Sequence, residues 1–366
     1  MIRALQHFSD RLFGRGDAAT TIPPFDGPLR PNQLLEAAPV ALSLEGAEDL
    51  ASDGKELYAA AGSRVFRLSG NEFLEIARFE APITALCSVA EKSLAVAIAG
   101  REIRILGGIH DGKSWREAGG RPFMSVNAIA RDADGGGVLV TEGSRTHRYE
   151  DWCHDLMARG ASGRAFSIDF KTGDTRAITD GLSYAFGVCA ADSAIWVSES
   201  WSHRLVAYKA ARESAPILEN LPVYPSRLSP AAGGGFWLTA FLARTQLVEF
   251  VLREPRYRER MMREIAPQFW IAPRLSSGHS YLEPMQGAHI KTMGILKPWA
   301  PPRSYGLVIR LTEEGLPIYS LHSRAGGSRH GVTSVVECGE FLYVLAKGDS
   351  KILALSLASI EQEFPR

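Results

Sequence analysis

The sequence has few cysteines, no excess of charge of either sign and no long apolar run. Its four cysteines lie far apart without a CxxC pair, at Cys87, Cys153, Cys189 and Cys338. This spacing does not support a zinc site and favours buried, reduced thiols. The 41 basic residues balance 41 acidic residues, which argues against nucleic acid as a partner. No stretch approaches the roughly 18 apolar residues that a membrane-spanning segment requires.

Several sequence motifs are also missing. No GxSxG, Walker or GxGxxG pattern appears in a suitable context, so serine-hydrolase, nucleotide and dinucleotide chemistry have no support. Residues 1–24 lack the apolar core of a signal peptide, because charged residues such as Arg3, Asp10 and Arg11 interrupt them. Their apolar spacing suits an amphipathic arm, for which packing on the protein or fraying is favoured over contact with a membrane surface. We therefore expect a cytoplasmic protein, with peripheral membrane association as the alternative.

What the sequence does contain is a strand pair that recurs six times. The copies begin at Glu48, Thr84, Asn127, Phe186, Ser226 and Thr333. Each copy has a short apolar stretch, a turn rich in Asp, Gly or Ala, and then a strand of β-branched or aromatic residues, which is a hairpin pattern. Such a repeat predicts an all-β, six-bladed β-propeller, whose inner strands converge on one channel. The six lead residues should then form a ring at the channel mouth.

The spacing of the copies predicts how the ring closes and where it is covered. The last copy is followed by too little chain for a full blade, so the stretch PVALSL at residues 39–44 should supply the missing strand. Residues 25–366 then form one propeller domain. Two insertions, at residues 144–162 and 241–305, each follow a second strand and should rise on the face that carries the ring, as lids. The larger one should contain a helix beginning near Pro255, with Tyr257, Met261 and Ile265 on one face.

Several stretches resemble strictosidine synthase-like proteins, within the six-bladed propellers that include gluconolactonases, regucalcin and paraoxonases. Examples are FDGPLRPNQLLEAA from Phe25, GAEDLASDGKELYAAAGSRVFRL from Gly46 and YGLVIRLTEEG from Tyr305. The resemblance runs from Phe25 onward and implies the propeller fold. It leaves the reaction open, because this group hosts hydrolysis, amine–aldehyde condensation and members without a known reaction.

The resemblance also implies what to expect of a metal. Calcium-dependent members hold the ion with a Glu in the first blade, Asn in the third and fourth, and an Asp in the fifth. Glu48 and Asn127 match the first two positions, whereas Phe186 and Ser226 replace the others. Calcium prefers six to eight oxygen ligands. We therefore expect no cofactor; if calcium or another divalent metal is retained, Glu48 and Asn127 are its ligands.

Candidate site residues follow from the ring and its lids. Glu48 and His330 are the predicted catalytic groups, since a partly desolvated carboxylate and a loop histidine suit proton transfer. The predicted substrate-binding residues are Asn127, Phe186, Ser226, Arg227, Thr333 and Trp152. Arg227 suits a substrate carboxylate. The competing interpretations are a structural ion pair between Glu48 and Arg227, a merely solvated His330, and a Trp152 that holds the first lid in place.

Three functions remain open from the sequence. The leading one is a metal-independent, strictosidine synthase-like enzyme that acts on a small organic molecule in the channel mouth, although its last blade lacks the catalytic Glu that the resemblance implies. The second is a lactonase or esterase that uses a divalent metal to polarise a carbonyl. The third is a non-catalytic propeller that binds a partner or a membrane surface. Nothing in the sequence indicates the oligomeric state.

Overall fold

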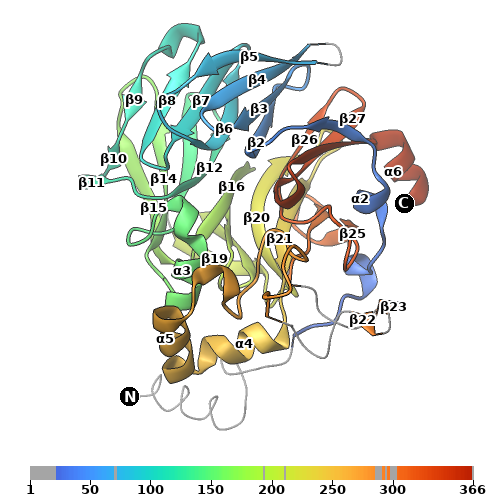
Figure 1. The fold of residues 1–366 in the computed structure, drawn as a ribbon. Coiled ribbons are helices and arrows are strands. Elements are labelled where there is room, and N and C mark those ends of the chain that lie inside the picture. The colour runs from blue at the N-terminus through green and yellow to red at the C-terminus, as the bar shows by residue number, and fades with distance from the viewer. Residues whose placement is uncertain are drawn as a thin grey trace.

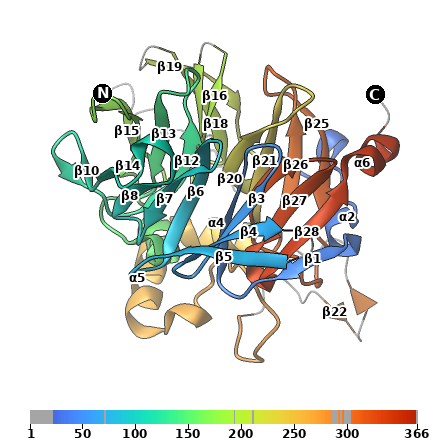
Figure 2. The ribbon, with the colours of Figure 1, turned by 90° about the horizontal axis from the view of Figure 1, so that it is seen from above.

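A computed structural model describes residues 22–69, 72–192, 194–209, 212–284, 291–292, 295–296 and 303–364. Within these residues, six four-stranded antiparallel sheets surround one axis (Figures 1 and 2). The six-bladed propeller expected from the repeat is thus confirmed. The proposed N-terminal arm, residues 1–24, lies almost wholly outside the described residues.

Each blade runs from an inner strand at the axis to an outer strand at the rim. Blade 1 comprises β2 (Ala47–Ser52), β3 (Leu57–Ala61), β4 (Arg64–Ser69) and β5 (Glu72–Arg78). Blade 2 comprises β6 (Ile83–Ala90), β7 (Ser93–Ile98), β8 (Glu102–Leu106) and β9 (Ser114–Trp115). Blade 3 comprises β12 (Val126–Arg131), β13 (Gly137–Glu142), β14 (Gly163–Asp169) and β15 (Thr175–Leu182).

Blades 4 to 6 repeat this order. Blade 4 comprises β16 (Ala185–Ala191), β17 (Ala194–Glu199), β18 (Arg204–Lys209) and β19 (Arg212–Leu218). Blade 5 comprises β20 (Val223–Pro230), β21 (Phe236–Ala243), β24 (Leu307–Leu311) and β25 (Pro317–His322). Blade 6 comprises β26 (Val332–Cys338), β27 (Phe341–Ala346), β28 (Lys351–Ser356) and the N-terminal β1 (Val40–Ser43).

The strand β1 closes the ring as expected. It pairs antiparallel with β28, with Val40 opposite Leu353 and Ser43 opposite Lys351. The last blade therefore takes its outer strand from the other end of the described chain. Because β1 covers the edge of β28, that strand does not present a free row of hydrogen-bonding groups.

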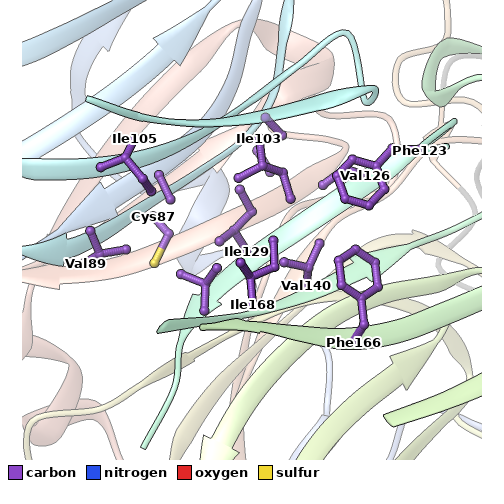
Figure 3. Close-up of a cluster of buried hydrophobic side chains, with 14 of the residues drawn as sticks. Cys87, Val89, Ile103, Ile105, Phe123, Val126, Ile129, Val140, Phe166 and Ile168 are labelled. Atoms are coloured by element: carbon purple, nitrogen blue, oxygen red, sulfur yellow. The ribbon is translucent and has the colours of Figure 1, made fainter. Parts of the chain in front are cut away.

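The core lies mainly between neighbouring blades. Figure 3 shows the cluster between blades 2 and 3, where β-branched side chains of β8, β12 and β14 interdigitate. Phe123 stacks on Phe166 there, with ring centroids 5.3 Å apart. Burying side chains of this size contributes about 1.5–3 kcal/mol each. Repeated packing of this kind fixes the positions of the inner strands.

The remaining elements are short. They are η2 (Gly27–Leu29), α2 (Leu34–Ala37), η3 (Gly108–His110), β10 (Glu117–Ala118), β11 (Arg121–Pro122), η6 (Lys347–Asp349) and α6 (Leu357–Glu363). The first lid contains η4 (Tyr149–Asp151) and α3 (Trp152–Ala158). The second contains α4 (Gln246–Arg253), α5 (Pro255–Glu264), η5 (Pro267–Phe269), β22 (Lys291–Thr292) and β23 (Ile295–Leu296).

Both lids follow a second strand, as the repeat predicts, and α3, α4 and α5 gather at one end of the propeller (Figure 1). The second lid begins later than expected, because Phe241 still belongs to β21. The helix expected near Pro255 is α5, but of its predicted apolar face only Met261 is buried, while Tyr257 and Ile265 are exposed. The sequence analysis missed α4, whose N-cap Thr245 accepts a hydrogen bond from the Val248 amide.

Candidate functional site

The ring residues predicted from the repeat all lie on innermost strands, one per blade. Glu48, Thr84, Asn127, Phe186, Ser226 and Thr333 belong to β2, β6, β12, β16, β20 and β26. All are buried except Glu48, whose side chain is 13% exposed. An innermost strand has no neighbour in its own sheet on the axis side, so backbone groups there need other partners.

A single side chain supplies several of these partners. From blade 5, Arg227 Nη2 donates to the carbonyls of Thr84 and Asn127, at 2.7 and 2.8 Å. Its Nη1 donates to the carbonyls of Glu48 and Thr333, at 3.3 Å each. The guanidinium therefore joins blades 1, 2, 3 and 6 to blade 5 at the level of the ring.

The charge of Arg227 is balanced from two directions. Its Nε lies 3.2 Å from Asp49 Oδ2, and its guanidinium carbon lies 5.3 Å from the centre of the Phe186 ring in blade 4. Burial would lower the pKa of Arg227, but the carboxylates of Asp49 and Glu48 and the Tyr149 hydroxyl outweigh it and raise the pKa. The guanidinium thus stays charged and contacts every blade.

Glu48 turns away from this arginine toward the lids. Lys347 Nζ lies 2.6 Å from each Glu48 carboxylate oxygen, and the Tyr149 hydroxyl donates to Glu48 Oε1. Lys347 Nζ is also 5.0 Å from the centre of the Tyr149 ring. Tyr149 comes from η4 in the first lid, and Lys347 directly follows β27. We call Glu48, Tyr149 and Lys347 the mouth triad.

The mouth triad is partly exposed to solvent, and its phenol is neutral. The side chains of Glu48 and Lys347 are 13% and 21% exposed, whereas Tyr149 is buried. Burial and the nearby Glu48 charge raise the pKa of Tyr149 well above its usual value, although Arg227 opposes this. Tyr149 is therefore a neutral hydrogen-bond donor, beside a carboxylate and an ammonium group.

An aromatic cluster covers this end of the channel. Phe186 packs against Tyr184 and Phe241, with ring centroids 6.0 and 5.4 Å apart. Trp152, at the start of α3, lies edge-on to Phe241 at 5.7 Å. These rings belong to a hydrophobic cluster that also includes residues of both lids. Because Trp152 is only partly buried, both packing and substrate contact remain open to it.

Buried polar contacts hold the lids in place. Asp155 of α3 accepts from Trp201 Nε1 at 2.8 Å and pairs with His147. Glu249 of α4 lies 3.3 Å from Arg244 Nε and 3.4 Å from His203 Nε2. Burial opposes ionisation of Glu249, but the hydrogen bonds and charges of His203 and Arg244 lower its pKa to about 2. Each lid is therefore attached to a blade by a buried carboxylate.

Three other predicted substrate-binding residues make hydrogen bonds within the propeller itself. Asn127 Nδ2 donates to the Ala185 carbonyl at 2.8 Å, and its Oδ1 accepts from Ser125. Ser226 Oγ bonds Thr239 of its own blade at 2.8 Å and lies 3.3 Å from the Val332 carbonyl of blade 6, to which it donates. Thr333 offers its carbonyl to Arg227, while its buried Oγ1 has no hydrogen-bond partner within the described residues. These contacts tie neighbouring blades together, and no substrate role is evident in them.

His330 and Arg227 differ most from their predicted roles. His330 is 3% exposed; its Nδ1 lies 2.6 Å from Ser304 Oγ, and its Nε2 lies 2.9 Å from the Arg324 carbonyl. Burial lowers its pKa, and within the described residues none of its contacts is with the mouth triad. Arg227 pairs with Asp49 rather than with the Glu48 carboxylate, so the competing interpretation of a Glu48–Arg227 ion pair is wrong. All its Nη contacts are to the protein itself, not to the open side where a substrate carboxylate was expected.

The sequence analysis missed Lys347 and did not select Tyr149. The repeat contains a signal for the first of these: the end of a second strand lies at the same end of the propeller as the start of an inner strand. Lys347 follows VLA in the sixth copy at this position. Tyr149 carries no such signal, because a loop gives no regular side-chain direction.

The alternative of a retained metal site at Glu48 and Asn127 does not fit this arrangement. The Glu48 carboxylate faces an ammonium group, the Asn127 amide is engaged by Ser125 and Ala185, and a guanidinium occupies the axis between them. Within the described residues, no group of three or more His, Cys, Asp or Glu side chains is placed to hold a metal ion. A divalent cation would meet two positive charges and few free oxygens.

Comparisons with known proteins support the fold. The chain is 22% identical to the adipocyte plasma membrane-associated protein of Rattus norvegicus, covering 92% of this chain and 91% of the relative. The gluconolactonase of Xanthomonas campestris has a similar structure, with a TM-score of 0.54 and 11% identity, covering 87% of this chain and 88% of that one. The PQQ-bound aldose sugar dehydrogenase of Streptomyces coelicolor is also similar in structure, with a TM-score of 0.50 and 12% sequence identity. That match covers 91% of this chain and 99% of the dehydrogenase.

These similarities define a class of fold. Within the described residues, the chain forms a six-bladed β-propeller, a fold similar to that of the gluconolactonase. No family model matches it. At such low identities, structural similarity establishes the fold alone, and membership of the strictosidine synthase-like family stays a prediction. Among the described residues, none of the helices has the length and apolar character needed to cross a membrane.

Proposed function

We propose that this propeller is a metal-independent enzyme that acts on a small organic carbonyl compound at its lidded mouth. The observation that carries the proposal is the mouth triad, in which an ammonium group and a phenol hydroxyl hold a partly exposed carboxylate beside an aromatic wall. Apolar walls with a few convergent polar groups are typical of small-molecule sites.

The triad suits the addition of a nucleophile to a carbonyl. Glu48 would accept the proton of an incoming water or amine as its lone pair attacks the carbonyl carbon. The carbonyl π electrons then move onto oxygen, where the Lys347 ammonium group stabilises the negative charge, and the Tyr149 hydroxyl turns to it once Glu48 holds the proton. With water and a lactone or ester, the carbonyl re-forms as the alkoxide leaves, and the alkoxide takes the proton from Glu48. With an amine and an aldehyde, the carbinolamine oxygen takes that proton and leaves as water. Both reactions begin with the same step.

The experiment screens the purified protein, without added metal, against a panel of lactones and aryl esters and a panel of amine–aldehyde pairs. For a substrate turned over by the wild type, Glu48→Gln should lower kcat/KM by about 10²–10⁴-fold, as expected for loss of a general base. The exposed Glu45→Gln is the matched control and should keep full activity. Unchanged turnover by Glu48→Gln would refute the assignment.

We also propose, as a second candidate, that the lid end associates with a membrane surface. The full-length relative named as plasma membrane-associated motivates this, together with exposed apolar residues on the lid. Phe250 on α4 and Tyr257 on α5 are each about half exposed, and the exposed Arg256 lies beside Tyr257. Aromatic and basic side chains together suit an anionic lipid interface.

Flotation with phosphatidylserine-containing vesicles tests this second candidate. The wild type should float with them, and Phe250→Ser combined with Tyr257→Ser should reduce the bound fraction severalfold. Ile109→Ser is the control, because Ile109 is apolar and even more exposed but lies on η3 in blade 2. Binding that is absent, or equally reduced by the control, would count against membrane association.

A further inference from the structure

We propose that Arg227 is a built-in cation that takes the place of a central metal ion and closes the propeller ring. The inference does not depend on whether the lidded mouth is an active site. It starts from the reach of this one side chain, which contacts carbonyls of blades 1, 2, 3 and 6 and an aromatic ring of blade 4 from its own position in blade 5.

The geometry of the axis calls for a positive charge. Inner strands leave carbonyl oxygens facing the axis, and four of them converge at the level of the ring. Carbonyl oxygens are ligands of hard cations such as calcium, but they are equally good acceptors for a guanidinium. A guanidinium provides several N–H donors in one plane, so it can satisfy carbonyls on different sides of the axis at once.

The residues around Arg227 suit a guanidinium better than a metal. Phe186 offers an aromatic face 5.3 Å from the guanidinium carbon, which attracts a guanidinium and provides no ligand for calcium. Gly187 allows the close approach of blades 4 and 5, because a Cβ there would lie 2.3 Å from the Ser226 carbonyl and 2.8 Å from Arg227 Cα. The side chain and its surroundings therefore fit together as a unit.

Asp49 completes the arrangement as counter-charge. Its Oδ2 lies 3.2 Å from Arg227 Nε and also accepts from the Leu86 amide of blade 2 at 2.8 Å. Its Oδ1 accepts from the Leu50 amide of its own strand. The carboxylate thus joins blades 1 and 2 while facing the arginine. Together, Arg227 and Asp49 do what a metal ion and its acidic ligand would otherwise do.

The first arm of the test uses the wild-type chain. Protein purified without chelator should contain far less than one divalent ion per chain by elemental analysis. Its melting temperature should be the same with a chelator and with millimolar calcium, because a ligand stabilises only a fold that binds it. A stoichiometric ion, or a melting temperature that falls on chelation, would overturn the proposal.

The second arm compares two buried arginines by hydrogen exchange. Arg227→Ala should speed exchange by about tenfold or more in the inner strands of blades 1, 2, 3 and 6. Arg310→Ala is the matched control, because Arg310 is also buried, bonds the carbonyls of Phe236 and Leu311, and lies 5.1 Å from the Trp237 ring, all within blade 5. Its effect should stay within that blade. The same exchange pattern in both variants would refute a ring-closing role.

Chemical rescue makes the test specific for the cation. About 10 mM methylguanidinium chloride should raise the melting temperature of Arg227→Ala, whereas methylammonium chloride at equal concentration should not. Equal effects of the two salts would overturn the proposal. If Arg227→Ala does not fold, Arg227→Lys replaces it; the charge is kept but the planar donors are lost, so exchange in the four distant inner strands should still rise. Wild-type exchange in Arg227→Lys would contradict the proposal.

Discussion

The two ends of the central channel are built from the same six inner strands but hold different chemistry. At the lid end, the mouth triad brings an acid, an ammonium group and a phenol together, and aromatic residues cover them. Beyond Arg227 and Asp49, the channel continues as a cavity of about 720 Å³ that reaches the turns between first and second strands. Its wall there includes Leu50, Cys87, Ala128, Ile129, Cys189 and Val335, and the charged residues Asp53, Lys55, Glu91, Arg131, Asp132 and Glu337 line it as well.

This difference shows that volume alone does not locate a site. The cavity has a size typical of ligand pockets. Its inner end, however, is closed by Arg227 and Asp49. These two side chains form an ion pair, and Asp49 also accepts a hydrogen bond from a backbone amide of blade 2. The lidded end instead brings an ammonium group, a carboxylate and a phenol hydroxyl into direct contact in the mouth triad. We therefore propose that the reaction takes place at the mouth triad, on the lid side of Arg227. The cavity on the other side of Arg227 is then a consequence of ring closure.

The largest expected effect concerns the thiols of the cavity. Burial raises the pKa of Cys87 and of Cys189 to about 12, with the Asp49 charge adding to the effect on Cys87. At pH 8 the thiolate fraction is then about 10³-fold smaller than for a free cysteine. Alkylation by iodoacetamide, followed by mass spectrometry, should be slower by that factor in native protein than in urea. Comparable alkylation rates in native protein and in urea would mean that these two thiols are reactive in the folded protein.

The next effect concerns the lid end. Lys347→Met should lower kcat/KM by about 10²-fold on an identified substrate, because the Glu48 carboxylate loses its counter-charge. Lys351→Met, which removes a lysine bonded to Ser43 at the rim, is the control. A kcat/KM equal to that of the wild type would separate Lys347 from the site.

The sequence repeat predicts the strands that build the channel, but not all of the side-chain contacts at its two ends. Alternation and turn residues fix where β2, β6 and the other inner strands begin, so Glu48 and Asn127 were placed at one ring correctly. The stretch at residues 39–44 was recognised as the closing strand β1, because the last blade was otherwise incomplete. These are local signals, repeated six times.

Side-chain partners across the axis carry no such signal. Glu48 has Arg227, Lys347 and Tyr149 within reach, and the choice among them depends on where each long side chain points. Arg227 turns to the carbonyls of four blades and thereby leaves Glu48 to Lys347. His330 follows a glycine-rich loop that suggests exposure, but Ser304 of the second lid covers it. Such contacts depend on the complete three-dimensional arrangement.

Acid should loosen the lid end before the rest of the propeller. The pKa of Glu249 is lowered to about 2, so its contribution to stability is present above its unfolded value near 4.3 and is lost as pH falls toward 2. Burial lowers the pKa of His203, whose neutral form stabilises the fold above about pH 6.5 and less at lower pH. Both contributions therefore decrease on acidification.

Urea unfolding between pH 7 and 3.5 measures this effect: of the full Glu249 contribution of about 3 kcal/mol, about 1 kcal/mol should be lost by pH 3.5. Hydrogen exchange at the same pH values should show α4 losing protection first. Glu249→Gln should be less stable at pH 7 and should show a shallower pH dependence. A pH dependence equal to that of the wild type would show that other groups govern acid unfolding.

The smallest expected effect distinguishes the two roles left open for Trp152. The ring lies at the start of α3 and packs edge-on to Phe241 at 5.7 Å and near Trp201 at 6.4 Å, with part of its surface free. If it mainly holds the first lid, Trp152→Phe should lower the free energy of unfolding by about 1 kcal/mol, since the replacement keeps an aromatic ring and loses part of the contact. The KM for an identified substrate should then change less than about twofold, because a packing residue adds little to binding. A KM that rises severalfold while stability is unchanged would instead assign Trp152 to the substrate, as a wall of the mouth that the lid presents to it.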